Sequence, residues 1–182
     1  VDVRMLPRGR PLVHTPHGLL RSEAWNGPMA RPVRRLLGSM DALVALSEYG
    51  AGVIRREVDS VAPGRVRVIP HGVLDYLTRL PRERPLPPEM VNVDGPVVLF
   101  FGLIRPYKGV DVLLEAFRSI EGADLLVVGR PFGVELSDLA EAARACRGTV
   151  RLVPRFVEDE EVPALFRRAD LVVLPHRDAE QS

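Results

Sequence analysis

Four short, continuously apolar runs follow one another in the second half of the chain, and they constrain its fold more than any other feature. They are PVVLFFG (96–102), ADLLVVG (123–129), TVRLVP (149–154) and ADLVVLP (169–175). Runs of this length and composition are typical of strands that are covered on both faces of a parallel sheet. Between them, apolar residues recur at helical spacing, for example within 110–117 and 162–169. This alternation predicts an α/β fold with a Rossmann-like parallel sheet.

The first part of the chain carries a weaker version of the same pattern. Runs at 11–15, 41–47 and 65–70 have the composition of strands. Helical patterns near 28–38 and 48–58 separate them. The order is that of the trailing half of a second α/β domain, and such a remnant alone would leave apolar surface uncovered.

A proline-rich stretch separates the two parts. Residues 75–96 hold five prolines and show little periodicity, which is typical of a linker rather than of a packed element. We therefore expect three regions: the end of an N-terminal Rossmann-like domain at 1–74, this linker, and a C-terminal Rossmann-like domain at 97–182.

Composition limits what such a chain binds. A net charge of +1 provides no basic excess for a nucleic-acid partner. The one cysteine, Cys146, can form no internal disulfide. No apolar run approaches the roughly 18 residues of a membrane span, and the first residues lack a signal-peptide core, so we expect a cytoplasmic protein. The chain begins without Met, which favours a piece of a longer protein.

Arginines are concentrated near the N-terminus, and the segment PMARPVRRLLG at 28–38 admits two interpretations. The commoner one is a solvated charged face. The other is a basic amphipathic helix that makes peripheral contact with anionic lipid at the inner membrane face.

The stretch FGLIRPYKGV at 101–110 places a glycine and two cations in a short loop between the first C-terminal strand and its helix. Ligands of open parallel sheets bind at the carboxyl ends of strands, where helix N-termini favour anions. Gly102 permits a sharp turn and the close approach of a ligand. Arg105 can bind two phosphate oxygens through its planar fork, and Lys108, the only lysine in the chain, adds a compact charge. The loop suits a diphosphate, and two solvated surface cations are the alternative.

Several segments together resemble glycosyltransferase family 4, whose members are retaining enzymes of the GT-B fold that use nucleotide sugars. The loop matches that family's G-x-x-R-x-x-K-G signature. Four other segments match in order along the chain: HTPHG (14–18), ALSEYGAGVIRRE (45–57), VIPHGV (68–73) and RFVEDEEVPALFRRADLVVLP (155–175). His71 stands where the family usually has Asn. The resemblance covers the chain from about residue 11 onward.

The resemblance implies roles on the donor side. Arg105 and Lys108, with Gly102 at the strand end, match the residues that hold the donor diphosphate. Glu180 matches the first glutamate of the family's Glu-x7-Glu motif, which contacts hydroxyls of the donor sugar. The donor is expected to be UDP- or GDP-linked, with no cofactor and no metal.

The remaining implied roles concern the nucleoside and the transferred sugar. Gly129, Phe156 and Val157 fall in strand-end loops that approach the nucleoside in such enzymes. His17 fits the family's T-x-H pattern better than His14, and it would be the catalytic residue that faces the transferred sugar. The acceptor stays open between a carbohydrate, a lipid and a small molecule.

Departures from the family pattern limit this interpretation. The second glutamate of the motif would lie beyond Ser182, and most of an N-terminal GT-B domain is missing, so we expect an incomplete piece with little or no activity. Two alternatives stay open: a phosphorylase or sucrose-type synthase of the same fold, and a noncatalytic nucleotide-binding or assembly partner. A Rossmann dehydrogenase is disfavoured because no G-x-G-x-x-G follows the first C-terminal strand.

Overall fold

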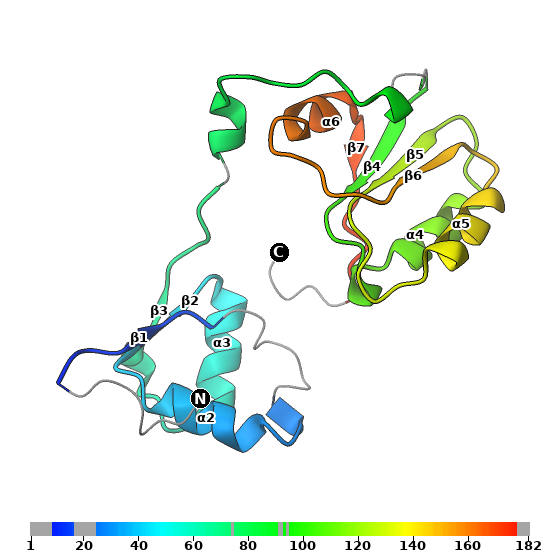
Figure 1. Cartoon of the computed structure of the whole chain (residues 1–182). Coiled ribbons are helices and arrows are strands. Elements are labelled where there is room, and N and C mark those ends of the chain that lie inside the picture. Colours follow the sequence, from blue (N-terminus) through cyan, green and yellow to red (C-terminus); the bar gives the residue numbers. More distant parts are fainter. Residues whose placement is uncertain (1–8, 17–24, 74, 91–92, 94, 178–182) are drawn as a thin grey trace. The chain divides into compact units, whose positions relative to one another are not determined.

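The computed structural model describes residues 9–16, 25–73, 75–90, 93 and 95–177 (Figure 1). The described residues divide into two compact units: unit 1 within 9–73 and unit 2 within 75–177. Each unit is described by itself.

Unit 1 is built on a small parallel sheet with the order β1-β2-β3. Its elements are β1 (Val13–His14), α2 (Ala30–Gly38), β2 (Ala42–Ala45), α3 (Glu48–Glu57), a 3-10 turn η2 (Pro63–Arg65) and β3 (Val66–Val68). Helix α3 starts at Ser47, whose hydroxyl oxygen accepts a hydrogen bond from the Gly50 amide at 3.1 Å. Leu37, Leu43 and Ile54, from α2, β2 and α3, are almost fully buried in one apolar core.

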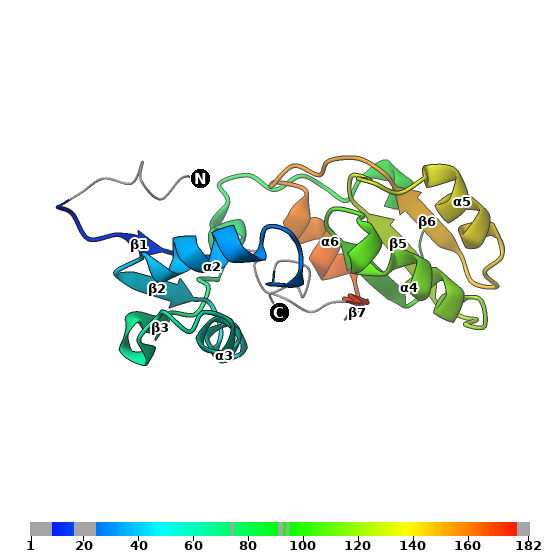
Figure 2. The same ribbon diagram turned by 90° about the horizontal axis from the view of Figure 1, so that it is seen from below.

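Unit 2 contains a four-stranded parallel sheet with the order β6-β5-β4-β7, in which β5 and β6 lie side by side (Figure 2). The strands are β4 (Val97–Phe101), β5 (Asp124–Val128), β6 (Val150–Val153) and β7 (Leu171–Val172). The helices are α4 (Val110–Phe117), α5 (Leu136–Arg144) and α6 (Val162–Arg168), with 3-10 turns η3 (Asp75–Arg79), η4 (Pro88–Met90) and η5 (Pro106–Lys108). The predicted alternation of strand and helix is confirmed.

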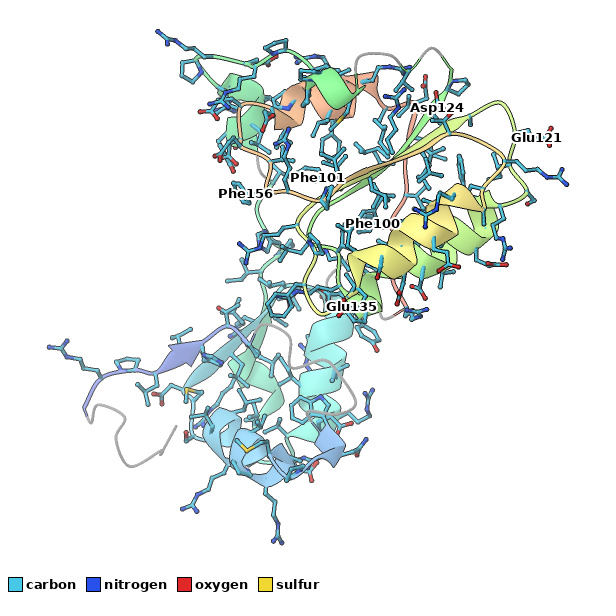
Figure 3. The ribbon with its side chains drawn as sticks, turned by 45° about the vertical axis from the view of Figure 1, so that its right-hand side comes forward. Phe100, Phe101, Glu121, Asp124, Glu135 and Phe156 are labelled. Atoms are coloured by element: carbon cyan, nitrogen blue, oxygen red, sulfur yellow. The ribbon has the colours of Figure 1, made fainter. Side chains whose placement is uncertain are left out.

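Helices cover both faces of this sheet. Helices α4 and α5 lie on one face and α6 on the other (Figure 1). Successive strand residues point to opposite faces, so Phe100 packs among the side chains of α4 and α5, whereas Phe101 packs on the core beneath α6 (Figure 3). Figure 3 also places Asp124, at the start of β5, and Glu135, beyond its carboxyl end, at opposite ends of the sheet. The carboxyl ends of β4, β5 and β6 therefore lie at the same end of the sheet, and the predicted loop follows β4 there.

The expectation that 75–96 lacks packing is wrong. Met90 is fully buried and Val93 is 5% exposed, and both belong to the core on the α6 face of the sheet. The Arg84 amide also donates to the Glu160 carbonyl at 2.9 Å. Prolines and the short turns η3 and η4 interrupt the segment, so its few apolar residues reach the sheet without the periodicity that would have marked them.

The last strand also differs from the prediction. The run at 169–175 forms a strand only at Leu171–Val172, on the sheet edge, where these residues are 56% and 41% exposed. A continuous apolar run does not by itself tell a strand covered on both faces from an edge strand.

Candidate functional site

The loops that follow β4 and β5 are packed backbone against backbone. The Gly102 amide donates to the Val128 carbonyl at 3.0 Å. Gly129 has a φ of +148°, and a Cβ built on it would lie 1.9 Å from the Gly102 carbonyl oxygen. No side chain fits there, so Gly129 fixes the position of Gly102 rather than offering a side chain to a ligand.

The loop after β4 is also attached to the loop after β5 further from the strands. The Ile104 amide donates to the Arg130 carbonyl at 3.0 Å, and the Phe132 amide donates to the Ile104 carbonyl at 2.9 Å. This pairing brings the Arg105 guanidinium over the Phe132 ring, 4.7 Å from its centroid. The contact holds a cation in place while leaving its hydrogen-bond donors for another partner.

Lys108 ends the turn η5 and lies close to the end of β4. The following residue, Gly109, has a φ of +67° and is the N-cap of helix α4. The Lys108 side chain folds back toward the sheet, so that its Nζ is 3.1 Å from the position that a Cβ on Gly102 would occupy. Two glycines therefore let one ammonium reach the strand end beside the N-terminus of a helix.

The segment after β7 crosses this turn. A Cβ on Gly109 would lie 2.0 Å from the Pro175 carbonyl oxygen. The Arg177 amide donates to the Tyr107 carbonyl at 2.8 Å. The Arg177 guanidinium donates to the Pro106 carbonyl at 2.8 Å and to the Asp111 carboxylate.

The site has an excess of positive charge. Among the described residues, no carboxylate pairs with Arg105 or Lys108. The nearby acid, Asp111 in the first turn of α4, is occupied by Arg177, whose hydrogen bond holds the pKa of that carboxyl below its usual value. Burial lowers the pKa of Lys108, and the charge of Arg105 lowers it further. An anion bound here would relieve that repulsion.

Two buried nitrogens in the same cluster lack hydrogen-bond partners. They are Arg105 Nε and His176 Nε2, and no partner is found for either within the described part of the chain. Burial also lowers the pKa of His176, and the charge of Lys108 lowers it further. Unsatisfied buried polar atoms of this kind are often completed by a ligand or by water.

The loop after β6 presents a more apolar surface. Phe156 is 62% exposed, whereas Val157 is buried. Their conformation is held by Glu161, a nearly buried acid that accepts two hydrogen bonds from the Arg155 guanidinium, at 3.0 and 2.8 Å. That bond to Arg155 is the main reason why the pKa of Glu161 lies below its usual value.

A cavity of about 310 Å³ opens next to the cationic cluster, between the starts of α4 and α5. Its rim includes Arg105 and Arg177 but also the acidic residues Asp111, Glu135 and Asp138. The acids outnumber the cations, so this cavity is a poor site for an anion.

The structure thus brings together Gly102, Arg105, Lys108 and Gly129, and it places Phe156 and Val157 in the next loop at the same edge of the sheet. His17 and Glu180 lie outside the described residues. Sequence reasoning missed Phe132 and His176, which reach the cluster only through contacts between loops far apart in the chain. The one available signal for Phe132 was its position three residues after Gly129, the glycine that ends the predicted strand at 123–129.

Comparisons with known proteins identify the family. A family model described as "Glycosyltransferase Family 4" matches residues 3–74, and a model described as "Glycosyl transferases group 1" matches residues 95–182. The chain belongs to glycosyltransferase family 4. The resemblance drawn from the loop and the four further segments is confirmed.

Curated relatives of this family 4 chain carry transferase names. D-inositol 3-phosphate glycosyltransferases of Segniliparus rotundus and Salinispora tropica are 32% and 33% identical, each over 92% of this chain. A GDP-mannose:glycolipid 4-beta-D-mannosyltransferase of Xanthomonas campestris is 36% identical over 47% of it. The chain spans 41%, 40% and 25% of these relatives' lengths, respectively.

Solved structures of similar fold agree with this assignment. Anabaena HepE in complex with UDP and glucose has a TM-score of 0.67 at 20% identity, with 90% of this chain and 46% of that chain covered. Sucrose-phosphate synthase from Thermosynechococcus elongatus has a TM-score of 0.65 at 22% identity, with 91% and 44% covered. At these identities the likeness shows the fold, which is of the α/β GT-B type as predicted.

Proposed function

We propose that this family 4 chain belongs to a glycosyltransferase that moves a sugar from a nucleotide-diphosphate donor to an acceptor, with retention at the anomeric carbon and without a metal. Unit 2 is the donor-binding part, and unit 1 belongs to the acceptor-side domain. The observation that carries the proposal is the pair of cations Arg105 and Lys108, which have no carboxylate partner among the described residues and lie at the carboxyl end of a parallel sheet.

The chemistry of the reaction explains why these residue types are needed. Breaking the bond between sugar and diphosphate builds positive charge on the anomeric carbon and negative charge on the leaving oxygen. Arg105 presents a planar fork to phosphate oxygens, and Lys108 presents a compact charge. The first amides of α4 add a positive dipole end. Fixed donors of this kind stabilise a developing anion without reorganisation during the reaction.

The nucleoside lies beside the loops after β5 and β6. Gly129 supports this role through the close approach of its backbone to Gly102. The exposed ring of Phe156 offers an apolar surface to a base, and Val157 anchors the loop in the core. The donor base is uracil or guanine: Anabaena HepE was solved with UDP, and the Xanthomonas relative is named for GDP-mannose.

The sugar-handling roles fall to two residues outside the described ranges. Glu180 binds hydroxyls of the donor sugar, and His17 faces the transferred sugar as the catalytic residue. In retaining transfer of this kind the departing phosphate takes the acceptor's proton, so the cationic cluster would also tune that phosphate's basicity. Both assignments rest on the sequence patterns around these residues.

The acceptor is best approached through the relatives that match most of the chain. Those that cover 92% of it are named for D-inositol 3-phosphate, which supports a small phosphorylated polyol as the first acceptor to test. Membrane contact through 28–38 stays a prediction. In that helix Leu37 is buried and Arg34 pairs with Glu57 at 3.0 Å, so these side chains are engaged within unit 1. No helix in the described part of the chain is long and apolar enough to span a bilayer.

Calorimetric titration with UDP, GDP and ADP tests the donor site. We expect one nucleotide to bind, and Lys108→Ala to weaken it about ten-fold or more, because a hydrogen bond to a charged group contributes about 1.5 to 3 kcal/mol. Arg118→Ala is the matched control, since Arg118 pairs with Glu115 on the surface beyond the far end of α4. Binding of no nucleotide, or equal affinities for wild type and Lys108→Ala, would contradict the proposal.

A further inference from the structure

His176 is held beside the cationic cluster by backbone contacts on both of its sides. Before it, the Pro175 carbonyl lies directly over Gly109. After it, the Arg177 amide and guanidinium both bond to carbonyls of η5. The imidazole ring lies 6.0 Å from the Tyr107 ring, measured between centroids. Its position therefore depends on the same turn that positions Lys108.

The His176 side chain has an unused nitrogen. Nε2 is inaccessible to solvent and has no hydrogen-bond partner within the described residues, and the same is true of Arg105 Nε. An imidazole nitrogen buried without a partner is destabilising unless something completes it. Arg105 and His176 each lie within electrostatic range of the Lys108 ammonium, which has no carboxylate partner among the described residues. An anion with several oxygens bound at Lys108 is therefore a candidate partner for both nitrogens.

Burial, and after it the charge of Lys108, favours the neutral form of the His176 ring. The groups that face it from the elements packed against it are Lys108 and Tyr107 from η5, Arg177 beside it, and Asp111 from the first turn of α4, which Arg177 occupies. Burial and the charge of Lys108 lower the pKa of His176. A bound diphosphate would add negative charge next to the ring and so raise the pKa of His176.

We propose that His176 is a third phosphate-binding residue, which donates from Nε2 to the diphosphate and takes up one proton from solvent as the diphosphate binds. The inference rests on the proposed donor site. A free nucleoside diphosphate carries more negative charge than the sugar-linked donor. His176 therefore binds the leaving group more strongly than the substrate, which is the direction that favours cleavage.

Proton uptake can be counted by calorimetry. The full chain is titrated with UDP, and in parallel with GDP, in two buffers of different ionisation enthalpy near pH 7. Binding with proton uptake tightens as the pH falls, so wild-type affinity should decrease between about pH 6 and pH 8. In His176→Gln the amide can still donate but cannot take up a proton. We expect this variant to bind with fewer protons taken up and with a flatter pH dependence. The phosphate's own titration is common to both proteins and cancels in the comparison.

Two further variants separate the role of the nitrogen from the shape of the ring. His176→Leu should lose about ten-fold in affinity, because it removes the donor. His71→Gln is the matched control, since His71 is exposed in unit 1, and it should leave the proton count unchanged. Far-UV circular dichroism checks that each variant is folded. The chain has only four histidines, so NMR can follow the His176 ring directly. The signal that disappears in His176→Gln is assigned to this ring. Its pKa should rise when the nucleotide binds.

The outcomes separate this inference from the proposed function. If the nucleotide binds wild type and Lys108→Ala weakens that binding, the proposed donor site is supported. An unchanged proton count in His176→Gln, or full affinity in His176→Leu, would then overturn only the proposed role of His176. If neither UDP nor GDP binds wild type, the donor site and the inference both fail.

Discussion

Among the described residues, Glu161 is the one charged residue that is buried, and replacing it with Gln tests how much it stabilises unit 2. Its side chain is 11% exposed and accepts three hydrogen bonds: from Arg155 Nη1 at 3.0 Å, from Arg155 Nη2 at 2.8 Å and from the Glu158 amide at 3.1 Å. Gln keeps one acceptor oxygen but turns an N–H group toward a guanidinium N–H. The substitution therefore removes the charge and at least one of these bonds.

The magnitude follows from the exposure of the two partners. A hydrogen bond between charged groups contributes about 1.5 to 3 kcal/mol, and breaking a fully buried pair costs more. The Arg155 side chain is 38% exposed, so water can solvate it again after the change. We therefore expect a loss of about 2 kcal/mol in the free energy of unfolding of unit 2. For a unit of about 100 residues this corresponds to a decrease in Tm of roughly 10 °C.

The pH dependence gives an independent check of the cause. Arg155 holds the pKa of Glu161 below its value in the unfolded chain, so the carboxylate stabilises the fold at neutral pH. That contribution is lost as the pH falls below the ordinary glutamate pKa of 4.5 and through the lower pKa of the folded carboxyl. The difference between wild type and Glu161→Gln should therefore be largest near pH 7 and shrink in acid.

The chain provides its own reference for the measurement. Its one tryptophan, Trp25, is buried in the core of unit 1, so tryptophan fluorescence follows unit 1. Far-UV circular dichroism follows both units. Glu161→Gln should therefore shift the unfolding transition of unit 2, which dichroism reports and tryptophan fluorescence does not. Glu158→Gln makes the same change on an exposed side chain and should shift neither the dichroism nor the fluorescence transition. A shift below about 0.5 kcal/mol, or an equal effect of Glu158→Gln, would refute the reasoning.

Three further predictions concern glycines and the cysteine. Gly129→Ala should destabilise the chain by at least about 2 kcal/mol more than Gly122→Ala. Both positions have positive φ, but only at Gly129 would the new methyl group meet the Gly102 carbonyl. Equal melting temperatures of the two variants would contradict this prediction. Gly52→Ala should stabilise α3 by about 0.5 to 1 kcal/mol, because nothing lies within 4 Å of the added atom; a lower fluorescence midpoint would be the opposite result. Burial raises the pKa of the Cys146 thiol, so a thiol reagent should react more slowly with the folded chain than in urea, and equal rates would exclude that burial.

The strands of unit 2 could be predicted because their residue types leave few alternatives. A run such as that of β4 has no polar residue to place in solvent, and a glycine ends it. Helix α4 could be predicted because Val110, Leu113, Leu114 and Phe117 lie on one face, and all four are buried. Both signals are local, so they can be detected in a short stretch of the amino-acid sequence.

Other features depend on contacts between distant segments and leave no local pattern. Met90 is buried because the turn η4 packs on the core at one face of the sheet, and the exposure of Leu171 follows from its place on the edge strand β7. Phe132 lies under Arg105 because two loops pair through their backbones. Nothing in the local sequence marks His176, and a nitrogen without a partner among the described residues becomes visible only once the segment after β7 is seen to cross η5.

The presence of a single lysine among 25 Lys and Arg residues has a physical explanation in the loop. Lys108 Nζ lies 3.1 Å from the position of an absent Cβ on Gly102, so a side chain at residue 102 would crowd the ammonium. A planar guanidinium is wider and would need room on both sides of its plane, where the backbones after β4 and β5 are already in contact. Arg105, by contrast, lies over an aromatic ring, which suits a planar cation. The two cations therefore have different surroundings: Lys108 lies beside the backbone of Gly102, and Arg105 lies over the ring of Phe132.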